Sequence, residues 1–356
     1  MKRCVASVSA IAVMLWVGPA LAQQKAKAQN VAEIPYTSVP NFLKLPPGEY
    51  LGESVGVATN SKGHVFVFHR SANTRLFEFD ENGNFLKEIG KGYYGFEFAH
   101  SVRVDPQDNI WTVDEGTNMV TKFSPDGKVL MVIGRRPPPI EGAVATPSGP
   151  NKPAEKYIFC RPTDVGWDPQ GNIFVSDGYC NNRVVKFDKD GRFLAQVGSE
   201  KAGKEPGEFN LPHGLQVDRQ GNVYVADRGN RRIQVFDEEG KFLRQITIDV
   251  PVDPNARPAI GNKPPATVTG TMAPGAPWAI CITPGPNQVL YSSDAFPGRI
   301  YKLSLEGKVM GVLGESGKQL KQFGWIHEIA CPSENELYVG ELLNWRVQKL
   351  ILEPNH

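Results

Sequence analysis

The sequence predicts an all-β protein built as a six-bladed β-propeller. Six copies of one pattern follow one another from Gly52 to the C terminus, and a repeat of about 40 residues is typical of solenoids and propellers. Within the copies, turns rich in Asn, Asp and Gly, such as DPQGN and DRQGN, separate short apolar runs, as expected for hairpins. No stretch after the N-terminal segment has a helical period, so four short strands per copy favour a propeller over a helical solenoid.

The six copies begin at about Gly52, Phe96, Phe159, Phe209, Pro277 and Phe323. The sixth copy holds only three apolar runs before His356. We therefore expect the stretch from Asn41 to Leu45 to supply its fourth strand. Such an N-terminal strand would close the ring and remove its exposed edges.

Two inserts rich in Pro and Gly interrupt the repeat, one from Arg135 to Tyr157 and one from Asp249 to Ala276. Neither can supply a long strand ladder, because Pro lacks the backbone N–H that a ladder needs. We expect both to be loops on one face of the propeller. They are either flexible decoration or a rim around a binding cleft.

The N terminus is typical of a secretory signal peptide. The basic start MKR precedes the apolar run VASVSAIAVMLWV and an A-x-A motif that ends at Ala22, and this run is too short for a membrane span. We expect a signal peptide at 1–22, a flexible lead at 23–38 and the propeller at 39–356, with the mature chain secreted or periplasmic. The net charge of +1 gives no reason to expect a nucleic-acid or membrane partner. We expect a monomer that binds a small-molecule or peptide substrate.

Four cysteines remain after removal of the signal peptide, and an even number suggests disulfides in an oxidising compartment. Cys160 lies where the inner strand of the third copy begins. Cys180 lies in the loop that returns to the same end, which favours a local bridge. Cys281 and Cys331 occupy near-equivalent points of adjacent copies, so they either pair or remain buried thiols.

Three histidines, His100, His213 and His327, stand at one position of the repeat in every second copy. In a propeller the first strand of each blade lines the channel, so these residues should face one another around the axis. Across the copies this position reads Val55, His100, Thr163, His213, Trp278 and His327. One histidine alone could cap or pack at a strand start, but three in this register favour a metal site. Three imidazoles with an open fourth position are a pattern of catalytic zinc, although iron, copper or cobalt could also bind.

Two further candidates follow second strands and should lie at the same end of the ring. Tyr179 directly precedes Cys180, and a tyrosine held beside a disulfide is well fixed for proton transfer. Arg70 ends the second strand of the first copy and could hold a carboxylate through two hydrogen bonds. Each residue, considered alone, could instead be structural.

At these positions the chain resembles the peptidyl-α-hydroxyglycine α-amidating lyase family, whose members are six-bladed propellers with NHL-like repeats. The similarity covers about Val39 to Leu350. It is most specific in FCRPTDVGWDPQGNIFVSDGYCNNRVVKF, and GVATNSKGHVFVFHR and VADRGNRRIQVF are also similar.

The resemblance implies two metal ions and several site residues. A catalytic zinc would bind His100, His213 and His327, with Tyr179 and Arg70 as catalytic residues and a disulfide between Cys160 and Cys180. A structural calcium in the channel would bind the backbone oxygens of Val57 and Val102 and the side chain of Glu328. Hard oxygen ligands suit calcium.

The family splits a peptide that ends in α-hydroxyglycine into a peptide amide and glyoxylate. The resemblance implies that zinc polarises the substrate hydroxyl, Tyr179 removes its proton and the N–C bond breaks as the aldehyde forms. Arg70 would orient the carboxylate or stabilise the tyrosinate.

The sequence departs from the family at three places. Trp325 replaces a methionine that shapes the pocket, Glu328 replaces an aspartate at the calcium, and the family's disulfide in the fourth copy has no counterpart. No copper monooxygenase domain is found that would make a peptidyl hydroxyglycine. We therefore expect an α-hydroxyglycine-type substrate, a carbinolamide, rather than a particular peptide.

Two alternatives stay open. The chain could be a non-enzymatic exported propeller that binds a protein or glycan and keeps a structural metal. It could also be a lactonase-like hydrolase, but such sites use Glu, Asn and Asp around calcium, and the histidines argue against this.

Overall fold

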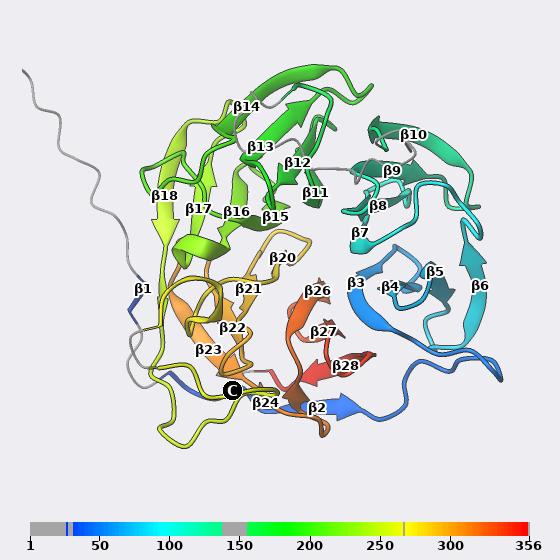
Figure 1. The fold of residues 1–356 in the computed structure, drawn as a ribbon. Coiled ribbons are helices and arrows are strands. Elements are labelled where there is room, and N and C mark those ends of the chain that lie inside the picture. Colours follow the sequence, from blue (N-terminus) through cyan, green and yellow to red (C-terminus); the bar gives the residue numbers. More distant parts are fainter. Residues whose placement is uncertain (1–25, 28–30, 137–154, 266–267, 355–356) are drawn as a thin grey trace, which may run out of the picture.

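Six four-stranded antiparallel sheets are arranged as blades around a central axis (Figure 1). The computed structural model describes residues 26–27, 31–136, 155–265 and 268–354. The expected signal peptide at 1–22 and most of the first insert lie outside these ranges. The prediction of an all-β, six-bladed propeller is confirmed.

The blades have the following strands. Blade one holds β3 (Glu53–Thr59), β4 (Val65–Arg70), β5 (Thr74–Phe79) and β6 (Phe85–Ile89); blade two holds β7 (Ala99–Val104), β8 (Ile110–Asp114), β9 (Met119–Phe123) and β10 (Val129–Gly134). Blade three holds β11 (Pro162–Trp167), β12 (Ile173–Asp177), β13 (Asn182–Phe187) and β14 (Phe193–Ser199); blade four holds β15 (Pro212–Val217), β16 (Val223–Asp227), β17 (Arg232–Phe236) and β18 (Phe242–Ile246). Blade five holds β20 (Ile280–Ile282), β21 (Leu290–Ser293), β22 (Ile300–Leu303) and β23 (Val309–Leu313); blade six holds β26 (Ile326–Ser333), β27 (Glu336–Glu341), β28 (Arg346–Leu352) and β2 (Tyr36–Val39).

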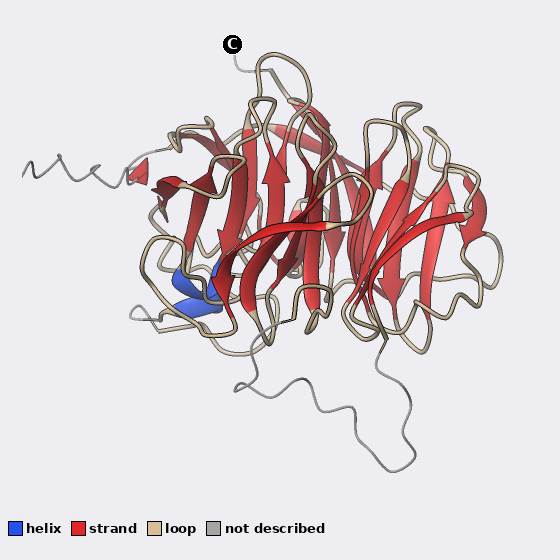
Figure 2. Cartoon of the chain, turned by 90° about the horizontal axis from the view of Figure 1, so that it is seen from above, coloured by secondary structure: helices blue, strands red, loops and turns tan. Residues whose placement is uncertain are grey.

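A few short elements lie outside the blades. β1 (Ala26–Lys27) pairs with β19 (Ile248–Asp249), and β24 (Glu315–Ser316) pairs with β25 (Gln322–Phe323), both in parallel. The 3-10 turns η1 (Arg228–Asn230) and η2 (Gly270–Met272) contact each other at one face of the ring (Figure 2). No helix in the described ranges is long and apolar enough to cross a membrane.

The turns inside the blades follow the pattern that the sequence predicts. In blade three, the Asp168 carboxylate accepts hydrogen bonds from the backbone N–H groups of Gln170 and Asn172. Gly171 between them has a φ of 85°, a conformation that glycine adopts without steric cost. Asp218 in blade four makes the same bonds. The inner hairpins of blades three and four are thus closed by the same local hydrogen bonds. The first strand of each blade faces the axis (Figure 1).

An N-terminal strand closes the ring, as predicted, but it lies a few residues earlier than the stretch from Asn41 to Leu45. β2 pairs with β28, with Tyr36 opposite Leu352. Asn41 instead follows the strand with a φ of 49°, which ends the extended run. Side chains along β2 are alternately buried and exposed, as in a strand with one face on the core: Tyr36 and Ser38 are buried, and Thr37 is exposed. This explains why this stretch forms the closing strand. The propeller therefore begins inside the segment that was expected to be a flexible lead.

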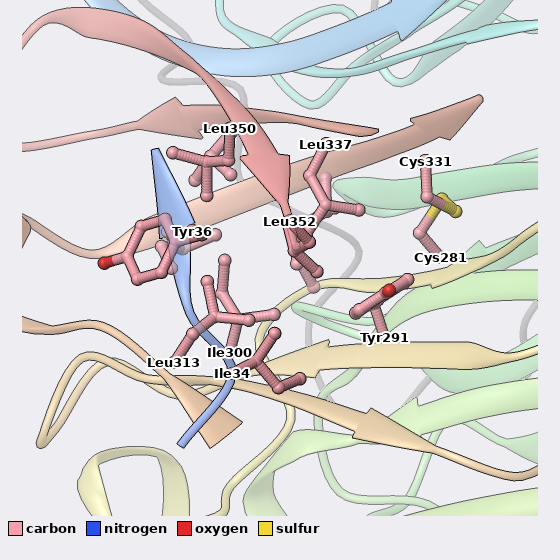
Figure 3. Close-up of a cluster of buried hydrophobic side chains, with 14 of the residues drawn as sticks. Ile34, Tyr36, Cys281, Tyr291, Ile300, Leu313, Cys331, Leu337, Leu350 and Leu352 are labelled. Carbon is pink, nitrogen blue, oxygen red and sulfur yellow. A yellow bond between two sulfur atoms is a disulfide. The ribbon is translucent and has the colours of Figure 1, made fainter. Parts of the chain in front are cut away.

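Four cysteines of the propeller form two disulfides. Cys160 and Cys180 are joined within blade three, as predicted. Cys281 and Cys331, for which the sequence left pairing open, join blades five and six. The second bridge borders a buried apolar cluster of Ile34, Tyr36, Leu337, Leu350 and Leu352, which fills the closing blade (Figure 3).

Candidate metal centre

The channel brings three histidines together at one end of the ring. His100, His213 and His327 lie at the starts of the inner strands β7, β15 and β26. Their ring centroids are 4.6 to 4.9 Å apart, and all three side chains are buried. One nitrogen from each ring lies within 4.8 Å of the other two. Residues that are more than 100 positions apart in the sequence therefore converge on one point.

A backbone carbonyl group orients each imidazole. Each Nδ1 atom lies 2.6 to 2.8 Å from one carbonyl oxygen, in the pairs His100–Thr163, His213–Trp278 and His327–Val55. These carbonyls belong to the same repeat position in the three blades that lack the histidine. Because a carbonyl only accepts, Nδ1 carries the proton and Nε2 keeps its lone pair. Metal-binding histidines are commonly oriented in this way.

Burial keeps the three imidazoles neutral. It lowers the pKa of His327 to about 3 and lowers the pKa values of His100 and His213 well below their usual range. The positive charges of Arg70 and Arg228 act in the same direction on His327. Three neutral nitrogen donors with free lone pairs fit a zinc-type ion that keeps an open coordination position.

The hydroxyl group of Tyr179 lies next to the histidines. It is 3.3 Å from Nε2 of His100 and 3.5 Å from Nε2 of His213. Of the residues expected at the site, Tyr179 is therefore the one whose reactive atom is adjacent to the imidazole nitrogens. It could exchange a proton with a molecule bound at this point.

Local structure holds Tyr179 in this position. The next residue, Cys180, is bonded to Cys160. The preceding residue, Gly178, lies so close to Pro212 that a Cβ atom would overlap with the carbonyl oxygen of Pro212. The motif SDGYC therefore combines a residue without a side chain, a fixed tyrosine and a covalent anchor.

Arg70 lies at the same end of the ring but is already engaged. Its Nε donates to Glu53 at 2.7 Å, and its Nη1 donates to Glu115 and to the carbonyl oxygen of Ala99, both at 2.8 Å. Its guanidinium stacks on Phe98. Only Nη2 is left to bind a substrate. Arg70 therefore has fewer free donors than the two hydrogen bonds to a carboxylate that the sequence analysis expected would require.

Arg228, which the sequence analysis missed, is the arginine with free donors. Its side chain is buried, its Nε has no hydrogen-bond partner, and it forms no ion pair with a described residue. The guanidinium carbon lies 4.4 Å from the ring centroid of Trp278 and 5.6 Å from that of Tyr179. The signal was available in VADRGN, because Arg228 directly follows Asp227 at the end of a second strand, and Tyr179 lies two residues after the corresponding Asp177.

Two tryptophans form an aromatic wall beside the histidines. The ring centroids of Trp278 and Trp325 are 5.4 Å apart. Trp278 donates to the carbonyl oxygen of Thr271 in η2, so the end of the second insert lies at this face. Nε1 of Trp325 is buried without a partner. The wall therefore presents apolar surface and one free donor.

At the position expected to hold calcium, hydrogen-bond donors surround the Glu328 carboxylate. Oε2 of Glu328 accepts hydrogen bonds from the backbone N–H groups of Val57 and Val102 at 3.0 and 3.1 Å. Oε1 accepts from the Ser101 hydroxyl at 2.7 Å and lies 3.0 Å from Nε of Arg103. Burial raises the pKa of the Glu328 carboxyl, and Arg103 opposes this. N–H groups and a guanidinium thus surround the carboxylate at this point.

Comparisons with known proteins agree with the propeller fold. A family model described as "6-bladed beta-propeller" matches residues 163–257. Peptidyl-glycine alpha-amidating monooxygenase A of Xenopus laevis is 28% identical over 326 residues, which are 82% of this chain and 31% of that protein. Peptidyl-alpha-hydroxyglycine alpha-amidating lyase 1 of Drosophila melanogaster is 26% identical over 335 residues, which are 85% of this chain and 57% of that protein.

Two further similarities concern the fold and a different kind of relative. NHL repeat-containing protein 3 of Homo sapiens is 32% identical over 209 residues, which cover 55% of this chain and 56% of that protein. A solved structure of streptogramin B lyase is similar with a TM-score of 0.55 at 14% identity, covering 90% of this chain and 98% of that chain. The chain spans less than two thirds of the length of the curated relatives named here.

Proposed function

We propose that this chain, whose homologues include peptidyl-α-hydroxyglycine α-amidating lyases, is an exported zinc-dependent carbon–nitrogen lyase. Its substrate would be an α-hydroxyglycine-type carbinolamide, cleaved at the N–C bond to an amide and glyoxylate. One observation carries the proposal: three neutral imidazoles converge on one point, and two of them lie within 3.5 Å of a tyrosine hydroxyl. A buried arginine that forms no ion pair with a described residue lies next to them.

His100, His213 and His327 would hold the metal through their Nε2 atoms, because their Nδ1 atoms are committed to backbone carbonyls. When bound, zinc supplies a Lewis acid for an oxygen of the substrate. The rings of Tyr179 and Trp278 flank this position, each with its centroid 6.1 Å from that of His213.

Tyr179 would act as the general base. As a phenolate it accepts the proton of the substrate hydroxyl, and the oxygen lone pair forms the C=O bond of glyoxylate. The C–N bond breaks, and its electron pair leaves on the nitrogen, which takes the proton back from Tyr179. The guanidinium carbons of Arg161 and Arg228 lie 4.5 and 5.6 Å from the tyrosine ring centroid, so positive charge is available beside the phenolate.

Arg228 would bind the carboxylate that becomes part of glyoxylate. A buried guanidinium without an anionic partner is unfavourable, and a substrate carboxylate would supply that partner. Arg228 also stacks on Trp278, which fixes the plane of its donors for a paired hydrogen bond. Arg70 would add a donor from Nη2 at the opposite side of the histidines.

Export is proposed on two grounds. The N-terminal sequence is typical of a signal peptide, and two disulfides join four cysteines of the propeller. Disulfides of this kind persist mainly in oxidising compartments.

The decisive experiment measures glyoxylate release from N-benzoyl-α-hydroxyglycine at neutral pH, together with zinc content per chain. We expect near one zinc per chain in the wild type and in Tyr179→Phe, with glyoxylate release reduced at least about 100-fold in Tyr179→Phe, the lower range for a lost general base. His213→Ala should lose both zinc and activity. Unchanged release by Tyr179→Phe would contradict the proposal, and a blank without protein corrects for spontaneous breakdown.

A second candidate function is a non-enzymatic exported propeller that binds a protein or glycan. The similarity to NHL repeat-containing protein 3 favours it. Wild-type protein that binds one metal per chain, yet releases no glyoxylate above the blank, would support this candidate over the lyase.

A further inference from the structure

A buried arginine occupies the channel directly beyond the histidines. Arg103 in β7 lies three residues after His100 and is buried. Its Nη2 lies 2.6 Å from Asp164 Oδ2, and its Nε lies 2.9 Å from Asp164 Oδ1 and 3.0 Å from Glu328 Oε1. One guanidinium is therefore shared by two buried carboxylates from blades three and six.

The same two carboxylates tie together most of the inner strands. Glu328 accepts backbone N–H groups of Val57 and Val102 in blades one and two. Asp164 accepts the backbone N–H of Leu215 in blade four at 2.8 Å. With Arg103 at the centre, this network connects five of the six blades around the axis.

The groups around Glu328 disfavour the binding of a divalent ion at this point. A calcium ion takes six to eight oxygen ligands at about 2.3 to 2.6 Å, and here both oxygens of Glu328 already face N–H donors or the guanidinium. Those donors carry positive partial charge and repel a cation. A divalent ion could use Asp164 and Glu328 only if Arg103 moved away.

We propose that the guanidinium of Arg103 is a built-in cation that takes the place of a structural divalent ion in this channel. The histidine centre would then be the one point of the channel that requires a metal, and the ring would hold together without calcium. This inference does not depend on the lyase activity, because it concerns the packing of Arg103, Asp164 and Glu328.

Thermal unfolding of the zinc-loaded protein, with and without millimolar calcium, tests the proposal. The midpoint of the wild type should be unchanged by calcium, and elemental analysis should find no stoichiometric calcium. Arg103→Ser leaves two buried carboxylates without a cation, so its midpoint should fall on the order of 10 °C. Calcium should restore at least half of this loss, or should be required for refolding.

Arg183→Ser is the matched control. Arg183 is also fully buried, with Nε 3.0 Å from Asp177 Oδ2, but it pairs with a single carboxylate outside the channel. The Arg183→Ser variant should have a lower unfolding midpoint than the wild type, and calcium should not restore it. Stoichiometric calcium in the wild type, or an Arg103→Ser variant that does not respond to calcium, would overturn the proposal. Arg103→Lys, which keeps the charge, should fold and stay insensitive to calcium.

Discussion

At the scale of single residues, free hydrogen-bonding capacity distinguishes the arginines around the histidines. Arg70 donates from Nε and Nη1 to two carboxylates and a backbone carbonyl. Arg161 is paired with Glu115. Arg228 is buried without an ion pair among the described residues, and its Nε lacks a partner. A motif identifies an arginine, but only its neighbours decide whether its charge is free to bind a substrate.

Arg228→Gln tests this distinction. Loss of a charge-assisted hydrogen bond costs about 1.5 to 3 kcal/mol, so kcat/KM for N-benzoyl-α-hydroxyglycine should fall about 10- to 150-fold. Most of the change should be in KM. The matched variant Arg161→Gln removes the other charge beside Tyr179 and should lower kcat while KM changes little.

The carboxamide analogue of the substrate provides the internal check, because it lacks the anion that Arg228 would bind. Arg228→Gln should lower the rate for this analogue much less than the rate for the carboxylate substrate. Equal effects of Arg228→Gln on both compounds would show that Arg228 does not contact the carboxylate.

At the scale of the elements, the inner strands divide two tasks between alternate blades. β7, β15 and β26 supply the imidazoles, and the inner-strand position of the other three blades supplies the carbonyl groups that orient them. The residues at those other positions, Val55, Thr163 and Trp278, have different side chains, because only their backbone oxygens form the hydrogen bonds to the histidines. The alternation in the sequence therefore reflects a division between side-chain and main-chain roles.

The loop between β12 and β13 carries Tyr179 and is held by the disulfide between Cys160 and Cys180. Replacing both Cys160 and Cys180 with Ser opens a bridge across 20 residues and should cost about 3 kcal/mol of unfolding free energy. The released Tyr179 should lower kcat for glyoxylate release at least about tenfold, since catalysis depends on fixed geometry. Zinc content should stay near one per chain, as measured by elemental analysis.

Replacing Cys281 and Cys331 with Ser provides the comparison. These cysteines line a cavity on the far side of Arg103, away from the histidines. Their loss should lower the unfolding midpoint but leave kcat within about twofold. Equal losses of kcat in both double variants would mean that the first bridge acts on overall stability rather than on Tyr179.

At the scale of the whole molecule, the N and C termini of the propeller share one blade. β2 pairs with β28 and covers the edge that the last copy would otherwise expose. Because blade six also carries His327 and Glu328, closure of the ring and assembly of the channel are coupled. The arrangement predicts that the propeller unfolds and releases its metal together.

Tyr36→Ala measures this coupling. Tyr36 is buried in the cluster that fills the closing blade, and its hydroxyl donates to the carbonyl oxygen of Lys321. Its truncation should lower the free energy of unfolding by about 3 to 5 kcal/mol. Zinc release and loss of the β-sheet signal in circular dichroism should occur at the same temperature. Thr37→Ala, an exposed change on the same strand, should stay within about 0.5 kcal/mol of the wild type. Zinc release at a clearly higher temperature than unfolding of blade six would contradict the coupling.

Sequence reasoning succeeded where a feature repeats once per blade. The six blades, the closing N-terminal strand and the bridge between Cys160 and Cys180 follow from a period of about 40 residues and from local turns. The convergence of the histidines is visible in advance because a closed ring converts equal spacing in the sequence into positions around one axis. Tyr179 was found because it stands next to a cysteine in a specific motif.

The sequence by itself thus determined the architecture and the repeat position of the histidines. Only the tertiary structure decided that β2 spans Tyr36–Val39, that Cys281 pairs with Cys331, and that Arg228 has no ionic partner in the part of the chain that is described. It also decided that Arg103 fills the gap between Asp164 and Glu328. The physical reason is that these outcomes depend on which side chains from different blades meet in space. Periodicity fixes where a residue lies on its own blade, but it does not say which charges and hydrogen bonds its neighbours from other blades have already used.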